Sequence, residues 1–120
     1  MYDIIAINPR PPLPKESEFF TISHWTLRNE NWRILIDVLC VICPEITGRE
    51  KQQLTDFEGR QLVGKKVEGV LIALRRVLLN RGQHKSFVVD DEVINAEPWL
   101  WEGLESIYEI LCWSDGFIVR

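Results

Sequence analysis

Apolar residues recur at the spacing of an α-helix in three stretches of this chain, and the first runs from about residue 29 to residue 43. Positions three and four residues apart share one face of a helix. On that face lie Trp32, Leu35, Leu39 and Ile42. Asn29 and Asn31 are candidate N-caps, and Pro44 ends the stretch. The other sides of this stretch are apolar too, so we expect a central helix. Because residues 34–43 include several β-branched side chains, a strand is the alternative prediction for that part.

The second apolar stretch runs from about residue 60 to residue 80, and the third from about residue 98 to residue 113. In the second, the residues at helical spacing are Val63, Val67, Val70, Leu71, Leu74, Val77 and Leu78. A candidate C-cap, Gly82, follows it. In the third, the expected buried stripe is formed by Leu100, Leu104, Ile107 and Leu111. Pro98 suits the first position of that helix, and residues 95–97 can cap it.

Shorter elements are expected between these helices. The residues fit a helix over 49–57 and a strand over 87–89, and the apolar lead 4–7 leaves room for a short N-terminal strand. Residues 8–14 hold four of the six prolines, which remove backbone donors and block helix, so we interpret them as an extended connector. A proline-rich ligand for another domain is the alternative. The predicted fold is mostly α: one small helical domain over 1–120, a bundle of three to five helices.

The composition is that of a folded domain without a membrane anchor. Of the 120 residues, 46% are hydrophobic and 27% charged, whereas disordered chains combine few apolar residues with high net charge. The longest apolar run, 34–43, is shorter than the roughly 20 residues that span a bilayer. The N-terminus lacks the basic start and the long apolar stretch of a signal peptide. The three cysteines are an odd number, which favours a reducing compartment, so we expect a cytoplasmic protein without a membrane partner.

Charge is segregated along the chain. The net charge is −4, which disfavours free nucleic acid as a partner, because phosphate binding requires a basic surface. A basic protein is the easier partner electrostatically. Most basic residues fall between Arg49 and Lys85. From Ser86 to Val119 every charged residue is acidic: Asp90, Asp91, Glu92, Glu97, Glu102, Glu105, Glu109 and Asp115.

Cys40 and Cys43 have the spacing of a redox pair, but their setting argues against that chemistry. A reactive thiolate is stabilised at a helix N-terminus. These cysteines lie at the C-terminal end of the first predicted helix, where the helix dipole opposes a negative charge. We therefore expect buried, inert thiols. Zinc would need further ligands from Cys112, His24 and His84, and no second pair of ligands has the usual spacing. We expect no metal and no cofactor.

No set of residues in the sequence makes an enzyme active site. His24 and His84 are isolated, without a nucleophile elbow or paired carboxylates near them in the sequence. We expect His24 to be structural and His84 to lie in a surface loop. Asp37 is the one charge within a long apolar run, and a buried carboxylate requires a partner. Arg33, one helical turn earlier, is the expected partner. The sequence therefore favours a binding protein over an enzyme.

The region most typical of a binding surface is acidic and aromatic. Glu102, Glu105 and Glu109 are spaced to form one stripe of the third helix, opposite its buried stripe. Aromatic side chains supply anchors at interfaces, and carboxylates steer a basic partner. The predicted partner-binding residues are Asp90, Asp91, Glu92, Glu97, Trp99, Trp101, Glu102, Glu105, Tyr108 and Glu109. The alternative is an ordinary solvated face whose tryptophans, with Trp113, belong to the core.

The acidic, aromatic stretch from Asp90 to Asp115 and the length of a lone domain resemble the bacterial toxin-immunity proteins. That resemblance implies an inhibitor without catalytic activity, which blocks a basic toxin domain, such as a nuclease, by binding it directly. The alternative hypothesis is a regulatory or nucleic-acid-associated adaptor that uses the basic segment 60–85. Its basic residues are Arg60, Lys65, Lys66, Arg75, Arg76, Arg81 and Lys85.

Overall fold

The computed structural model describes residues 2–11, 24–55, 60–63 and 65–120. Within these residues the chain forms helices and strands in a mixed α+β fold, so the expectation of a mostly α bundle is wrong. The helices are α1 (Asn29–Ile42), α2 (Gly48–Leu54), α3 (Lys65–Leu79) and α4 (Pro98–Cys112). The strands are β1 (Tyr2–Ala6), β2 (His24–Leu27), β3 (Arg60–Val63), β4 (Ser86–Val89), β5 (Glu92–Asn95) and β6 (Gly116–Val119).

Four of the strands form an antiparallel sheet in the order β2-β1-β6-β3. Its two central strands come from opposite ends of the described chain, and Ile4 of β1 lies opposite Val119 of β6. Burial alternates along β1: Tyr2, Ile4 and Ala6 are buried, and the residues between them are partly exposed. This alternation is that of a strand with one face on the core. The sheet therefore forms one wall of the core.

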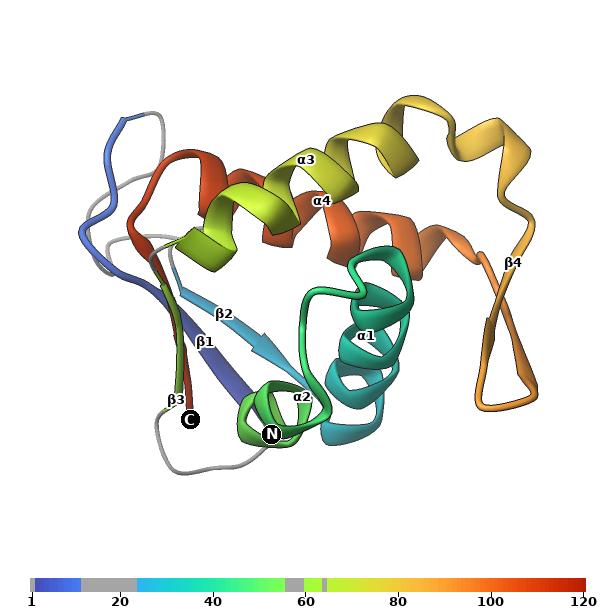
Figure 1. Cartoon of the computed structure of the whole chain (residues 1–120). Coiled ribbons are helices and arrows are strands. Elements are labelled where there is room, and N and C mark those ends of the chain that lie inside the picture. The colour runs from blue at the N-terminus through green and yellow to red at the C-terminus, as the bar shows by residue number, and fades with distance from the viewer. Residues whose placement is uncertain (1, 12–23, 56–59, 64) are drawn as a thin grey trace.

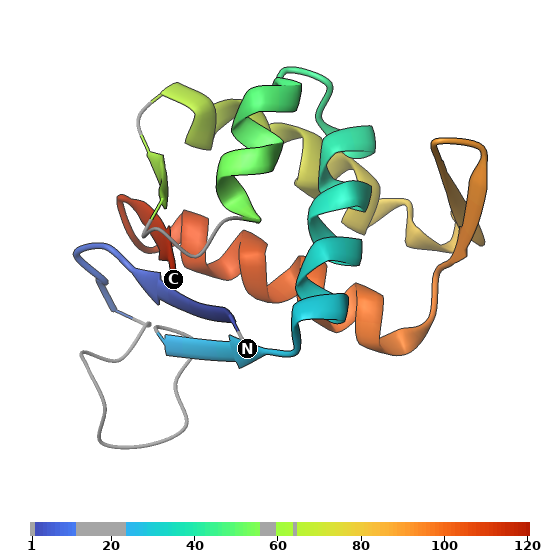
Figure 2. The same ribbon diagram turned by 90° about the horizontal axis from the view of Figure 1, so that it is seen from below.

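The helices pack against the buried face of this sheet, as Figures 1 and 2 show. Trp32 of α1 lies at the centre, with its ring centroid 6.2 Å from that of Tyr2 and 6.0 Å from that of Phe117. The indole Nε1 donates a hydrogen bond of 2.8 Å to the carbonyl oxygen of Leu54, which satisfies its buried donor. This tryptophan thereby joins the sheet, α1 and the end of α2.

α1 and α4 follow the sequence prediction closely. α1 is helical over the predicted stretch as far as Ile42, with Cys43 as its C-cap, so the strand alternative for 34–43 is wrong. α4 begins at Pro98, which occupies the expected first position. The predicted N-caps of α1 are wrong, because Arg28 occupies that position. The N-cap of α4 is Glu97, within the predicted 95–97, although its side chain makes no capping hydrogen bond. Gly103 lets α4 approach α1, since a Cβ there would lie 2.7 Å from the Cδ atoms of Leu35.

The second predicted helix is shorter than expected. Residues 60–63 form β3, and α3 begins only at Lys65. Gly82 is not a C-cap, because a 3-10 turn over Arg81–Gln83 follows the helix. The short helix predicted over 49–57 is α2, which has a capping box between Thr47 and Glu50 with bonds of 3.2 and 3.1 Å.

The remaining sequence predictions concern the ends of the fold. The strand predicted over 87–89 is confirmed as part of β4, and the N-terminal strand is β1. Of the predicted connector 8–14, residues 8–11 are described, and the rest lies outside the described residues. None of the helices in the described parts of the chain has the length and apolar character needed to cross a bilayer.

Candidate functional site

The acidic region begins in a β-hairpin formed by β4 and β5. The two strands pair from Ser86 opposite Asn95 to Val89 opposite Glu92. The two-residue loop, Asp90 and Asp91, has positive φ angles of 48° and 66°. A type I′ turn needs positive φ at both positions, and aspartate tolerates that conformation better than most residues. The Asp-Asp sequence therefore fits the tight turn of this hairpin.

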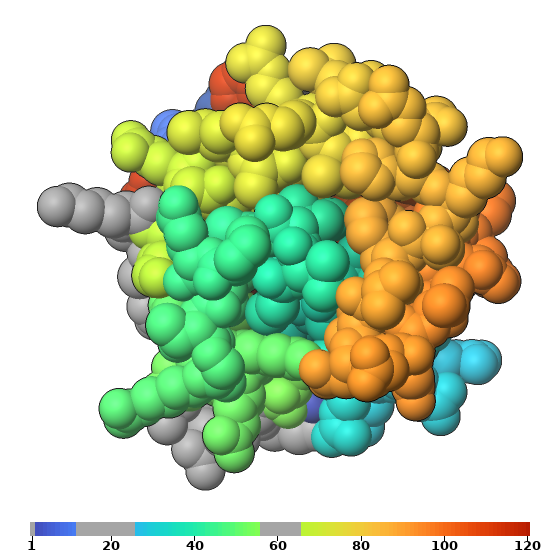
Figure 3. Space-filling view, turned by 45° about the vertical axis from the view of Figure 1, so that its right-hand side comes forward, coloured from blue at the N-terminus to red at the C-terminus, as the bar shows by residue number. Residues whose placement is uncertain are grey.

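The hairpin lies at the end of the molecule opposite the four-stranded sheet, as Figure 1 shows. Phe87 and Val89 on its inner face are buried, and β4 contacts α1. In Figure 3 the hairpin surface, in orange, borders those of α1 and α2. The packing of Phe87 and Val89 thus fixes the hairpin on the body and presents its turn to solvent.

The acids of the turn form no ion pair with a cation of the described residues. Asp90, Asp91 and Glu92 are all exposed. The charge of Asp90 contributes to raising the pKa of Lys51 on α2, after the larger effect of a hydrogen bond with Asp37. The turn therefore carries an unneutralised negative charge near α2.

On α4 the predicted acidic stripe is interrupted. Glu102 and Glu109 are exposed, and neither has an ion pair within the described parts of the chain. Glu105, between them, pairs with Arg81, which comes from the turn after α3. Glu97 at the N-terminus of α4 is exposed, and its Oε2 accepts a hydrogen bond of 2.9 Å from Nε1 of Trp99. The negative charge available to a partner thus comes from Glu97, Glu102 and Glu109.

The aromatic residues of α4 lie between the core and the surface. Trp99, Trp101 and Tyr108 are partly buried and pack against the core. Trp101 meets Phe87 of the hairpin edge-on, with a centroid distance of 5.9 Å. Trp113, just after α4, is 43% exposed. The rings of Trp99, Trp101 and Tyr108 therefore lie between the core and the acidic surface of α4.

The guanidinium of Arg81 holds α3 and α4 together at this surface. Its central carbon lies 5.6 Å from the centroid of the Trp101 ring, and one of its nitrogens pairs with Glu105. The ring of His84 stacks on Phe87 at 5.6 Å, so the partly buried histidine supports the base of the hairpin. The hydrogen bond with Cys112 raises the pKa of Tyr108, and the charge of Arg75 on α3 lowers it slightly. Arg75 of α3 and Arg81 of the following turn thus lie beside α4.

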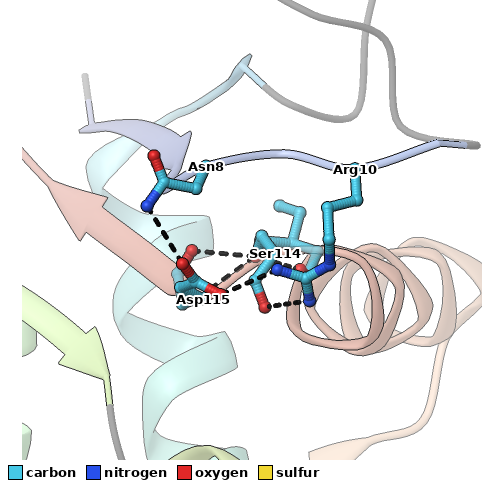
Figure 4. Close-up of polar contacts among 6 residues, drawn as sticks. Asn8, Arg10, Ser114 and Asp115 are labelled. Atoms are coloured by element: carbon cyan, nitrogen blue, oxygen red, sulfur yellow. Dashed lines mark hydrogen bonds and ion pairs between the residues drawn. The ribbon is translucent and has the colours of Figure 1, made fainter.

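Asp115, the last acid of the region, is neutralised by the N-terminal segment. It accepts hydrogen bonds from Asn8 Nδ2 at 3.0 Å and from Arg10 Nη1 at 2.7 Å (Figure 4). These bonds, that of Asn8 first, lower the pKa of Asp115. Arg10 Nη2 also donates to the carbonyl oxygen of Ser114 at 3.1 Å. The contacts fasten the start of the proline-rich segment to the loop before β6, and they remove Asp115 from the acidic surface.

The predicted partner of Asp37 is wrong. Asp37 pairs with Lys51 of α2 at 2.6 Å, while Arg33 is exposed. Packing of α2 against α1 brings Lys51 to Asp37, and local helical spacing cannot show such a partner. Burial raises the pKa of the neighbouring Cys40 thiol to about 11, and Cys43 is buried. The expectation of buried thiols therefore holds for Cys43, whereas Cys40 is only partly buried.

Only some of the basic side chains of segment 60–85 are free to bind a partner, because others are paired within the protein. Lys66 Nζ lies 3.1 Å from Glu50 Oε1 and donates to the carbonyl oxygen of Glu45 at 2.6 Å. Arg81 is paired as described above, whereas Arg75, Arg76 and Lys85 are exposed. The side chains of Arg60, Lys65 and His24 lie outside the described part of the structure.

Sequence reasoning missed four exposed apolar residues. Val88 and Val93 are 59% and 65% exposed on the outer face of the hairpin, and Ile72 and Leu79 are 63% and 74% exposed on α3. The signal for Ile72 and Leu79 was their place off the buried helical period. For Val88 it was the alternation of a strand whose neighbours Phe87 and Val89 are buried. Val93 lies opposite Val88 in the register of the hairpin.

The residues that the structure describes contain no group of three or more His, Cys, Asp or Glu side chains placed to hold a metal ion. Comparisons of the chain with models of protein families, with curated proteins and with solved structures gave no match.

Proposed function

We propose that this protein works by binding a basic protein through the acidic surface of its hairpin and α4. The resemblance of the sequence to toxin-immunity proteins suggests that the basic partner is a toxin domain, which this protein inhibits by binding it. The observation that carries the proposal is a set of exposed acids that no cation neutralises within the described residues: Asp90, Asp91, Glu92, Glu97, Glu102 and Glu109.

The electrostatics of this surface suit recognition of a basic partner. Like charges that are not compensated within a protein repel each other, and an oppositely charged partner relieves that repulsion. Exposed acids also accelerate encounter with a basic protein, and salt screens the effect over about 8–10 Å. The partly buried rings of Trp99 and Trp101 hold the surface in place, since both pack against the core. A pre-formed surface loses little conformational freedom on binding.

Catalysis forms no part of the proposal. The thiol of Cys40 is partly exposed, and burial raises its pKa to about 11. An activated nucleophilic cysteine has a lowered pKa instead. The acids of the proposed surface are spread over the hairpin and one helix, which suits a broad contact with a protein surface.

The test is a comparison of two charge-reversed variants as baits in an extract of the native cell. The double variant Glu102→Lys/Glu109→Lys changes the proposed surface, and both residues are exposed. The control Glu30→Lys/Glu68→Lys makes the same change in net charge at exposed positions on α1 and α3. Each bait is crosslinked, and the captured protein is then purified and titrated by calorimetry.

We expect the wild type and the control to bind a basic protein with equal affinity. The Glu102/Glu109 variant should bind it at least tenfold more weakly, and the wild-type complex should weaken between about 50 and 200 mM salt. The proposal fails if the captured partner is not basic, or if it binds all baits alike. Salt-dependent binding to duplex DNA would instead favour an adaptor that uses the basic segment.

A further inference from the structure

The outer face of the β4–β5 hairpin presents two apolar side chains to solvent. Val88 and Val93 lie directly opposite each other in the strand register, and they are 59% and 65% exposed. The inner face, with Phe87 and Val89, is buried. Side chains directly opposite on neighbouring strands form one contiguous patch. The patch continues into the acidic turn, so apolar and negative groups lie together at this end of the molecule.

A second surface of the chain has the complementary character. On α3, Ile72 and Leu79 are 63% and 74% exposed, and their separation of seven positions places them on one side of the helix, about two turns apart. Arg75 and Arg76 lie between them in the sequence and are exposed as well. The opposite side of α3 is buried through Val70 and Leu74. The outer side of α3 therefore carries two exposed apolar side chains, with the two arginines between them.

The two surfaces match in both kinds of chemistry. The hairpin offers apolar side chains beside acids, and the outer side of α3 offers apolar side chains beside arginines. We propose that a second copy of this chain covers the hairpin, with Val88 and Val93 of one copy against Ile72 and Leu79 of the other. In that contact the acids of the turn face Arg75 and Arg76 of the second copy.

Burial of apolar surface and the pairing of opposite charges both favour a second copy of this chain as the partner of the hairpin. Burying exposed apolar surface contributes about 25 cal/mol per Å², and four exposed aliphatic side chains in one contact make association favourable. The acidic turn and the arginines set the register, since a like-charged approach is repelled. The patches are small beside the roughly 800 Å² per partner of a standard interface, so the association is weak and reversible. A contact between two different surfaces either closes reciprocally in a dimer or repeats from copy to copy.

The inference does not rest on the proposed function. Both proposals use the acids of the turn, but the bait test of the proposed function changes Glu102 and Glu109 on α4, which take no part in the self-contact. A negative result in the self-association experiment therefore does not contradict the proposed function, and a negative bait test does not contradict self-association.

The experiment measures the mass of the purified chain by sedimentation over a range of concentrations. The hairpin variant is Asp90→Asn/Asp91→Gly/Glu92→Lys, because Asn-Gly preserves a type I′ turn while the charge changes. The helix variant is Arg75→Glu/Arg76→Glu. The control Arg33→Glu/Arg49→Glu makes the same change of net charge at exposed arginines of α1 and α2.

We expect the average mass of the wild type and of the control to rise with concentration, and salt to reduce the rise. Each charge variant alone should stay monomeric, because its hairpin and its α3 then carry the same sign of charge. An equimolar mixture of the two should associate again, since the unchanged α3 of the first fits the unchanged hairpin of the second. Val88→Thr/Val93→Thr, which keeps the β-branched shape, should weaken association several-fold.

The proposal is overturned if the wild type remains monomeric at millimolar concentration, which would assign the hairpin to a different protein. It is also overturned if the mixture of the two charge variants remains monomeric while the wild type associates. Circular dichroism of each variant identifies any that fails to fold. The valine variant then provides a second measurement that is independent of charge.

Discussion

Arg81 lies over the ring of Trp101, with its central carbon 5.6 Å from the ring centroid, while it pairs with Glu105 on the same helix. The residue comes from the turn after α3, and both of its partners belong to α4. One side chain therefore fastens the end of α3 to the helix that carries the proposed surface, and it reduces the charge of that surface.

This contact predicts a measurable loss of stability. Arg81→Ala should lower the free energy of unfolding by about 1 kcal/mol, because an exposed cation–π contact and an exposed ion pair each contribute up to that amount. Arg76→Ala, which removes an exposed arginine of the neighbouring helix, should change it by less than about 0.5 kcal/mol. Urea denaturation followed by tryptophan fluorescence measures both. Equal effects of the two changes would contradict a special role for Arg81.

Two helical glycines should respond to alanine in opposite directions. A Cβ at Gly103 would lie 2.7 Å from the Cδ atoms of the fully buried Leu35. Overpacking there should outweigh the gain in helix propensity and destabilise the protein by about 1–2 kcal/mol. A Cβ at Gly69 would meet only the carboxylate end of the exposed Glu45. That side chain can move away, so Gly69→Ala should stabilise by up to about 1 kcal/mol.

Thermal denaturation of the two glycine variants, followed by circular dichroism, provides the measurement. A stabilised Gly103→Ala protein would mean that α1 and α4 can separate slightly without cost. The close approach of the two helices would then not depend on the glycine.

The capping box of α2 predicts a dependence on pH. A hydrogen bond from the Thr47 backbone, followed by smaller contributions that include Lys66, lowers the pKa of Glu50 below its ordinary value of 4.5. A carboxyl whose pKa is lowered by folding stabilises the protein at neutral pH, and this contribution disappears as the pH falls through the folded-state pKa. Glu50→Gln should therefore cost about 0.5–1 kcal/mol at pH 7 and almost nothing in acid.

The measurement for Glu50 is a set of urea titrations of both proteins from neutral to acidic pH. Glu102→Gln is the control, because Glu102 is exposed and has no ion pair within the described residues. A constant difference between Glu50→Gln and the wild type at every pH would contradict the role of the carboxylate charge.

The thiols should react slowly in the native protein. With a pKa of about 11, only about one in a thousand Cys40 thiols is ionised at pH 8, and the thiolate is the reactive form. Modification by a disulfide reagent should accelerate about tenfold per pH unit and again when urea unfolds the protein. The variant Cys112→Ser restricts the measurement to Cys40 and Cys43. Rapid native modification at pH 7 would restore the redox interpretation of this pair.

The parts of the fold that could be predicted are those whose signal is local. α1 and α4 carry apolar residues at helical spacing over about four turns, and both formed where the pattern placed them. The sheet could not be predicted in the same way. Its strands have four or five residues each, and the pair of Ile4 with Val119 joins distant parts of the chain. No short window of sequence contains such a pair.

The same distinction applies to the candidate site. The acids of 90–109 were visible in the sequence, but the pairing of Glu105 with Arg81 depends on how α3 packs on α4. Asp37 gives the clearest case, because the helical spacing favoured Arg33 and the tertiary structure supplied Lys51. Which acids remain free for a partner is therefore a property of the packed structure.

The central position of β6 has a consequence for how the chain is made. A ribosome must synthesise every other described helix and strand before Gly116–Val119, yet β1 and β3 both pair with this strand. Until it emerges, β3 lacks its partner in the sheet, and β1 is paired along one edge only, with β2. Such late, long-range pairing is slow and leaves apolar surface open to other molecules in the meantime. The nascent chain is thus more exposed to aggregation and to chaperone binding before β6 emerges than after β6 has paired.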